Sequence, residues 1–413
     1  MLWLAAAVSD IGTWVQLIVV GSLVAATTGS AVQTGLVALA TFAPQGLASP
    51  VGGLLADRFE RRRVFASCLL VQALITTGLA VVLGAGVRTP GVLTLLILLS
   101  SAAGAMGSPA YAAMIPDLVP KEELMAMVSL GVYSWNAGRV VGPLLGTALE
   151  VAVGPSLTIA FNAATFIVLA VTVSAVRRTF HPQRSGGSIV ERLVGGWRAL
   201  RRAPGCWHSV VILVLFNLTV VPFMGLIPIY ARSVFGGGTA LTGLMSSAQG
   251  IGAIAGGLLV TALSSRLSRS YLLERIVIVE IVALALYAVA PDAWAVVPMA
   301  LFLGAGSSGL FITCSAILQR DAPDHSRGRV MATNQAFMGL SYGVGILTIG
   351  SLGDATNLRV AFGTGSLLLL VGFVALTRRS RNWRAALDGT PNVTESTAGS
   401  SSRSTLAGSS PVS

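Results

Sequence analysis

Long apolar segments separated by short polar breaks make up most of the chain. A helix that spans a bilayer needs about 20 consecutive, mostly apolar residues. Segments that meet this requirement cover approximately 2–27, 32–56, 64–86, 91–114, 124–149, 155–176, 207–231, 241–264, 271–290, 294–317, 328–350 and 359–377. The pattern predicts an all-α integral membrane protein with twelve transmembrane helices.

The composition agrees with a lipid environment. Hydrophobic residues make up 54% of the 413 residues and charged residues only 10%, whereas about a quarter of the residues of a soluble domain are charged. So few charged side chains cannot cover the surface of a soluble protein of this size, because that surface remains a large fraction of the whole. We therefore expect the lipid bilayer to cover much of this chain.

The basic residues indicate the orientation in the membrane. All but four of the 27 Lys and Arg residues lie in the breaks that follow every second segment or within a few residues of them; the exceptions are Arg88, Arg139, Arg232 and Arg359. Breaks rich in Lys and Arg stay in the cytoplasm. The alternation predicts a multi-pass protein of the cell membrane with both termini cytoplasmic, and it explains the net charge of +11 without a nucleic-acid partner.

The longest internal break separates six segments from six. Within it, Ile189, Leu193, Trp197 and Leu200 recur at helical spacing with arginines between them, which is typical of an amphipathic helix on an anionic membrane surface. Similar stretches at 115–120 and 319–323 suggest a duplicated six-helix unit.

The predicted organisation has four parts. They are an N-terminal six-helix bundle at 1–177, a cytoplasmic linker with the amphipathic helix at 178–206, a C-terminal six-helix bundle at 207–378 and a disordered cytoplasmic tail at 379–413.

Residues for catalysis or metal binding do not cluster in the sequence. The histidines and cysteines are scattered, at His181, His208, His325, Cys68, Cys206 and Cys314, so we expect neither a metal site nor a disulfide framework. The sole lysine, Lys121, follows a proline and belongs to no nucleotide-binding loop. We therefore expect no cofactor and no enzymatic activity.

A compact motif lies at the end of the second segment, with Gly53, Asp57, Arg58, Arg61 and Arg62 in order. It resembles the loop between helices two and three of the major facilitator superfamily, with Glu60 in place of the usual glycine. We expect Gly53 to allow two helices to approach closely. We expect Asp57 to act as a gate by facing the positive N-terminus of a helix in the other half.

The fifth segment carries Gly138, Gly142, Pro143 and Gly146. Glycines at four-residue spacing form a smooth stripe for helix packing. The stretch is similar to the helix-five motif that the superfamily's exporters of the proton-exchanging type carry, with Thr147 in place of the last glycine. Ordinary helix packing is the alternative interpretation.

Ionisable residues inside apolar segments are candidates for function. Arg139 lies in the fifth segment with Asn136 one turn before it, and Asp10 lies in the first. Because helices one and five are neighbours in the resembled fold, we expect Asp10 to pair with Arg139 and the group to couple transport to protons. A purely structural pair is the alternative, and we expect Glu280 to have a packing role.

The resemblance covers about residues 1–380, and the loop from Ala56 to Arg63 most resembles the branch with macrolide-efflux and enterobactin exporters. It implies a secondary transporter that works by alternating access and exports a small, mostly apolar compound in exchange for protons. Uptake of a small metabolite and a non-transporting membrane sensor remain the alternatives.

We expect a monomer. Because members of the branch often begin with a short basic stretch, we also expect a natural start upstream of Met1. The substrate-binding residues stay unknown at this point.

Overall fold

The computed structural model describes residues 1–176, 189–323, 326–380 and 382–388, and they are almost entirely helical. The helices are α1 (Leu2–Thr28), α2 (Ala31–Leu47), α3 (Ser49–Arg58), α4 (Arg61–Gly84), α5 (Pro90–Leu118), η1 (Lys121–Glu123), α6 (Leu124–Ser174), α7 (Ile189–Arg202), α8 (Pro204–Thr219), α9 (Pro222–Phe235), α10 (Thr239–Leu263), α11 (Arg269–Val289), α12 (Ala293–Asp321), α13 (Arg327–Ala355), α14 (Leu358–Arg379) and α15 (Trp383–Asp388).

Four of the predicted spans are interrupted or joined. The second is divided into α2 and α3 near Pro50, and the seventh into α8 and α9 before Pro222. The fifth and sixth are joined as α6, which bends at Gly154, where φ is 81°. Proline removes a backbone donor and glycine tolerates positive φ, so these residues stand where the helices break.

The prediction of an all-α membrane fold with twelve transmembrane helices is confirmed. Within the described residues, nine helical stretches are long and apolar enough to span a bilayer on their own. The other passes are the α2–α3 pair, α11 with its charged residues, and the second arm of α6.

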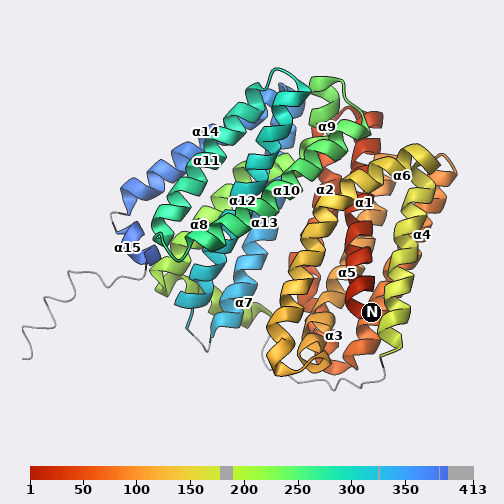
Figure 1. Cartoon of the computed structure of the whole chain (residues 1–413), viewed down its shortest axis with the longest axis horizontal. Helices are drawn as coiled ribbons and strands as arrows, with labels where there is room; N and C mark the ends of the chain where they lie inside the picture. Colours follow the sequence, from red (N-terminus) through yellow and green to blue (C-terminus); the bar gives the residue numbers. More distant parts are fainter. Residues whose placement is uncertain (177–188, 324–325, 381, 389–413) are drawn as a thin grey trace, which may run out of the picture.

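The helices form two groups that lie side by side. Helices α1–α6 lie on one side and α8–α14 on the other (Figure 1). Helices α1, α2 and α6 of the first group contact α9, α10 and α13 of the second. We call the end of the molecule with α3 and α7 the linker end, and the opposite end, with the turns at Gly29 and Gly236, the far end.

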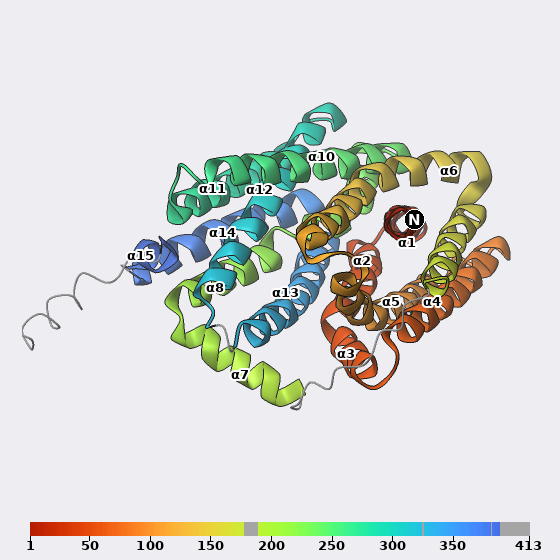
Figure 2. The same cartoon turned by 60° about the horizontal axis from the view of Figure 1, so that its bottom comes forward.

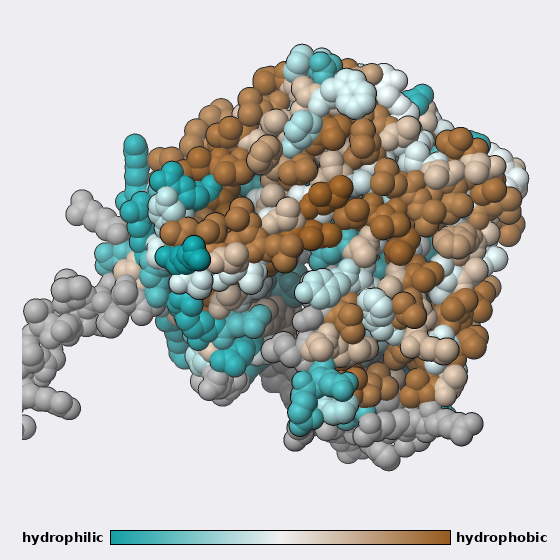
Figure 3. All heavy atoms as spheres, in the orientation of Figure 1, coloured by the Kyte–Doolittle hydropathy of each residue, from teal (hydrophilic) through white to brown (hydrophobic). Residues whose placement is uncertain are grey.

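The outer surface is apolar on both groups of helices, and hydrophilic residues gather toward the linker end (Figure 3). Side chains such as Leu74, Val151 and Leu258 are largely exposed. Exposed apolar area on this scale marks a surface that another apolar phase covers, which here is lipid.

Helix α7 crosses the linker end of the second group (Figure 2). A β-carbon placed on Gly196 would lie 2.4 Å from the Arg329 carbonyl oxygen of α13, so the two helices touch there. The Leu200 side chain is fully buried, and the Trp197 ring lies 5.4 Å from that of Phe337. The expectation that this apolar face lies on lipid is wrong for Leu200 and Trp197, which pack on protein; the side chains of Ile189 and Leu193 lie outside the described part.

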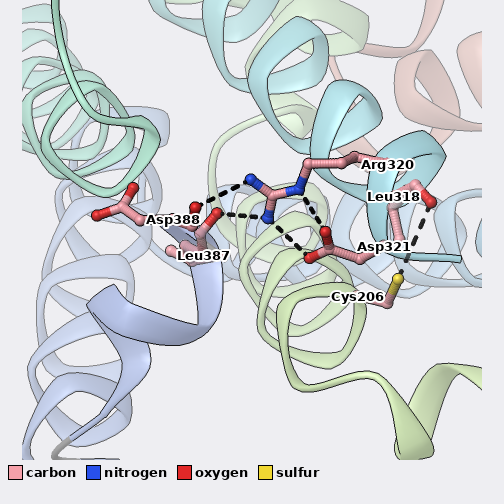
Figure 4. Close-up of polar contacts among 6 residues, drawn as sticks. All are labelled: Cys206, Leu318, Arg320, Asp321, Leu387 and Asp388. Carbon is pink, nitrogen blue, oxygen red and sulfur yellow. Dashed lines mark hydrogen bonds and ion pairs between the residues drawn. The ribbon is translucent and has the colours of Figure 1, made fainter. Parts of the chain in front are cut away.

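The short helix α15 docks on the second group through Arg320 (Figure 4). The Arg320 guanidinium pairs with Asp321 and donates to the carbonyl oxygens of Leu387 and Asp388, at 2.9 and 3.2 Å. The Asp388 carboxylate accepts from the Ser270 amide and hydroxyl. The expected disorder from 379 onward is therefore wrong for 383–388, and the expectation for 389–413 lies outside the described residues.

Candidate functional site

A cavity of about 500 Å³ lies between the two groups of helices, about halfway along them. The first group contributes side chains of α1, α2 and α6, and the second group contributes side chains of α8, α9, α10, α12 and α13. Figure 3 shows the face hollowed between the two groups on the linker-end side. Because both groups line it, any sliding of one group against the other changes the shape of this cavity.

Aromatic side chains cover the wall from the first group. The Trp14 ring lies 5.5 Å from Trp135 and 6.0 Å from Phe42, between ring centroids. Tyr342 of α13 continues the cluster across the interface, 6.1 Å from Phe42. Such a wall suits a planar or apolar ligand.

Arg139 of α6 lines the cavity one turn from Trp135. Its Nε donates to the Gln249 side-chain oxygen of α10 at 2.9 Å, and its Nη2 lies 3.7 Å from the Met224 sulfur of α9. The arginine of the first group is thus held by two residues of the second. Asn136 also lines the cavity.

Asp10 lies in a second cavity of about 460 Å³ within the first group. Its carboxylate accepts a hydrogen bond from the Ser134 hydroxyl at 2.7 Å. Among the described residues, Asp10 forms no ion pair with Arg139, so the expected pair is absent from this conformation. Phe42, Gln45 and Trp135 line both cavities, which therefore adjoin.

The glycines of α6 bring this helix close to α1, which carries Asp10. A β-carbon placed on Gly138, Gly142 or Gly146 would lie 3.0, 2.5 or 3.2 Å from atoms of Trp14 or Val15. Helix α6 therefore lies directly against α1. The Pro143 carbonyl oxygen accepts from the Thr147 hydroxyl, which also reaches the Thr239 carbonyl of α10.

The two groups are packed closely at the far end. A β-carbon on Gly225 of α9 would lie 2.7 Å from the Ala38 β-carbon of α2, and one on Gly35 would lie 2.9 Å from Ile346 of α13.

Beyond these contacts, the Asp354 carboxylate at the end of α13 accepts from the Ser30 hydroxyl at 2.6 Å and from the amides of Ala31 and Val32. A carboxylate of one group thus caps the N-terminus of a helix in the other. The sequence reasoning missed this contact, although Ser30 before an apolar run marks a helix start.

The arginine-rich loop lies at the linker end. Glu60, which replaces the usual glycine, pairs with Arg62 and Arg63 at 3.2 and 2.7 Å. Arg61 is buried and donates to the Ala113 carbonyl of α5 at 3.0 Å. Arg58 is exposed. The loop is therefore fixed to α5 by side-chain contacts.

The glycine that allows close packing is not the one we expected. A β-carbon on Gly53 would meet no atom within 4 Å, whereas one on Gly52 would lie 2.0 Å from the Met106 carbonyl oxygen of α5. The expected close approach at Gly53 is therefore wrong, and Gly52 provides it. Asp57 lies on α3, which packs against α5, and its gating role remains a prediction.

Glu280 of α11 is fully buried behind the cavity wall. The Ser307 hydroxyl, whose residue lines the cavity, donates to Glu280 Oε1 at 3.3 Å, and Gly306 gives the carboxylate its space. The contact joins α11 to α12.

Comparison with known proteins assigns the family. The family described as transmembrane secretion effector matches residues 1–396. The chain belongs to this family of the major facilitator superfamily. It is 26% identical to the multidrug efflux pump Tap of Mycolicibacterium fortuitum, over 90% of this chain and 93% of that protein. It is 21% identical to macrolide efflux protein A of Streptococcus pyogenes, over 90% and 94% of the two chains.

Other relatives agree with a transporter. The chain is 28% identical to the enterobactin exporter EntS of Salmonella typhimurium, over 84% of each chain. Among solved structures, a bacterial homologue of the human lysosomal transporter Spinster has a TM-score of 0.69 at 15% identity, over 94% of this chain and 96% of that one. A D-xylose–proton symporter has a TM-score of 0.69 at 16% identity, over 90% and 96%. The fold is that of the superfamily, and the protein is a membrane transporter.

Proposed function

We propose that this transporter exports a small, largely apolar organic compound from the cytoplasm by alternating access, in exchange for protons. The cavity between the two groups carries the proposal, because it has the size and aromatic lining of a small-molecule site. In transporters of this design the site lies near the bilayer midplane between two repeats. The predicted bundles at 1–177 and 207–378 would be the two moving bodies, and a monomer would suffice, since both bundles belong to one chain.

The direction of transport rests on relatives and on charge. Tap, macrolide efflux protein A and EntS are all described as exporters. The arginine-rich turns lie at the linker end, which the positive-inside rule assigns to the cytoplasm. Close packing at the far end then leaves the cavity accessible from the cytoplasmic side, as loading of an exporter requires.

Proton exchange rests on the half-buried carboxyl of Asp10. It lies in a polar cavity that adjoins the main one, so a change in its charge can be linked to the rearrangement of the shared wall at Phe42 and Trp135. The Ser134 hydroxyl donates to this carboxylate at 2.7 Å and fixes its position.

The test is an efflux assay in a host that lacks its major drug exporters. Cells that produce the protein should lose a panel of fluorescent aromatic compounds faster than cells with an empty vector, and an uncoupler should abolish the difference. Asp57→Asn, at equal amounts in the membrane, should slow the efflux. Faster accumulation in producing cells would support uptake instead, and an effect that survives the uncoupler would exclude protons as the driving ion.

A further inference from the structure

We propose that the cavity binds an aromatic organic anion, with Arg139 holding the negative group and the neighbouring aromatic side chains holding the ring. The inference rests on the proposed function and names the substrate class of the same site.

The charge of the cavity is the first observation. Among the described residues that line it, Arg139 is the one ionisable side chain with a full charge at neutral pH; the polar remainder consists of amides, serines and a tyrosine. The Arg139 contacts are neutral, with the Gln249 amide oxygen on Nε and the Met224 sulfur near Nη2. Its Nη1 has no hydrogen-bond partner within the described part of the chain.

Two carboxylates on membrane-spanning helices of the described part of the chain lie outside this cavity. Asp10 faces the adjoining cavity and accepts from Ser134. Glu280 lies behind Ser307, fully buried between α11 and α12. A guanidinium at the depth of the bilayer without a counter-charge is unfavourable, and a ligand that brings the negative group relieves this cost.

The form of the ligand follows from the neighbours of Arg139. The planar guanidinium donates best to a forked acceptor, such as a carboxylate or sulfonate. Trp135 lies one helical turn away on α6, and its side chain leads to Trp14 and Phe42. Residues four apart on a helix lie about 6 Å from one another. An aromatic ring directly attached to an anionic group spans this distance, whereas an organic cation would be repelled.

The experiment compares two dyes with one ring body. The probes are 1-anilinonaphthalene-8-sulfonate, which is an anion, and N-phenyl-1-naphthylamine, which is the same molecule without the sulfonate. Binding is measured by equilibrium dialysis with the full chain in nanodiscs, and binding to empty nanodiscs is subtracted. The proteins are the wild type, Arg139→Gln, Arg139→Lys, Gln335→Glu and, as a matched control outside the cavity, Arg359→Gln.

We expect the wild type and Arg359→Gln to bind the sulfonate at least about tenfold more tightly than the neutral dye, since a hydrogen bond to a charged group has this effect. Arg139→Gln should remove that preference and leave binding of the neutral dye unchanged, which also shows that the variant is folded. Arg139→Lys should retain part of the preference. Gln335→Glu adds a negative charge to the same cavity and should weaken binding of the sulfonate alone.

Equal binding of the two dyes by the wild type would overturn the inference without any variant. An unchanged preference in Arg139→Gln or Gln335→Glu would also overturn it. The proposed function fails differently: a wild type that prefers the sulfonate in nanodiscs but exports no compound from cells would contradict export and leave the anion site in place.

Discussion

Two adjacent glycines of α3 have opposite surroundings. Gly52 lies against the backbone of α5, and the space beside Gly53 is open. We predict that Gly52→Ala destabilises the protein by about 1–3 kcal/mol, the usual cost of overpacking, because the Met106 backbone cannot move aside like a flexible side chain. A thermal unfolding series in detergent measures the effect.

Gly53→Ala is the matched control, with the same chemical change one residue away. It should leave the unfolding temperature unchanged or slightly higher, since alanine favours helix over glycine. Equal destabilisation by the two substitutions would contradict the close approach at Gly52.

Asp10 supports a second prediction at this scale. Asp10→Asn keeps the shape of the side chain and its contact with Ser134 but removes the titrating carboxyl. We predict that it abolishes substrate accumulation driven by a proton gradient in inverted vesicles while exchange of labelled for unlabelled substrate continues. Substrate-induced proton flux is the decisive readout, with Ser134→Ala as a comparison that retains the carboxyl. Wild-type flux in Asp10→Asn would make Asp10 a structural residue.

The sequence predicted these residues better than their partners. Asp10, Arg139 and the α6 glycines stand out because they break an apolar pattern or repeat at helical spacing. Gln249 does not stand out, since a glutamine in a small-residue helix such as α10 has no distinguishing pattern. The partner of Arg139 depends on how α6 and α10 are rotated toward each other. That rotation cannot be predicted from the hydrophobic pattern of a single sequence.

The contact between α13 and α2 joins the two groups at the scale of whole helices. Asp354 lies in the last turn of the long helix α13 and caps α2, whose N-cap residue Ser30 is 324 positions earlier in the chain. We expect this contact to be lost when the far end opens, because it joins the two groups of helices there. An anion at a helix N-terminus contributes about 0.3–1 kcal/mol when exposed, as Asp354 is.

We predict that Asp354→Asn shifts the balance between the two access states toward the far-end-open state by about two- to fivefold. Hydrogen exchange followed by mass spectrometry should show faster exchange at the start of α2 and along the far-end halves of α9 and α13.

Asp292→Asn provides the control for this change. Asp292 also caps a helix, but the helix that it caps is its own, α12. Its carboxylate accepts hydrogen bonds from the amides of Trp294 and Ala295. Its loss should speed exchange in the first turn of α12 alone. If Asp354→Asn likewise affects α2 only locally, Asp354 is a simple cap and does not hold the two groups together.

At the scale of the whole molecule, the apolar segments predicted the fold because the bilayer allows few architectures: every backbone group must be satisfied within the span, so each segment is a helix. The cavity could not be predicted in the same way. Its lining comes from eight helices, and the inward and lipid-facing sides of each are both apolar, as the exposed Leu74 and the buried Leu79 of α4 show. The hydrophobic pattern, which indicates the core of a soluble protein, therefore does not indicate which residues of this chain face the substrate.

The orientation of the molecule in the membrane is the last prediction. The turn with Arg88, between α4 and α5, and the end of α7 at Arg202 lie at opposite ends of the helices. Basic residues concentrate at the linker end, so we predict that this end, with both termini, is cytoplasmic. Reporter fusions after Arg88 and after Arg202, read with alkaline phosphatase and green fluorescent protein, should give opposite results: phosphatase activity only at Arg88 and fluorescence only at Arg202. Reversed readouts would place the cavity opening outside the cell and turn the proposed exporter into an importer, whereas identical readouts would contradict the order of the transmembrane helices itself.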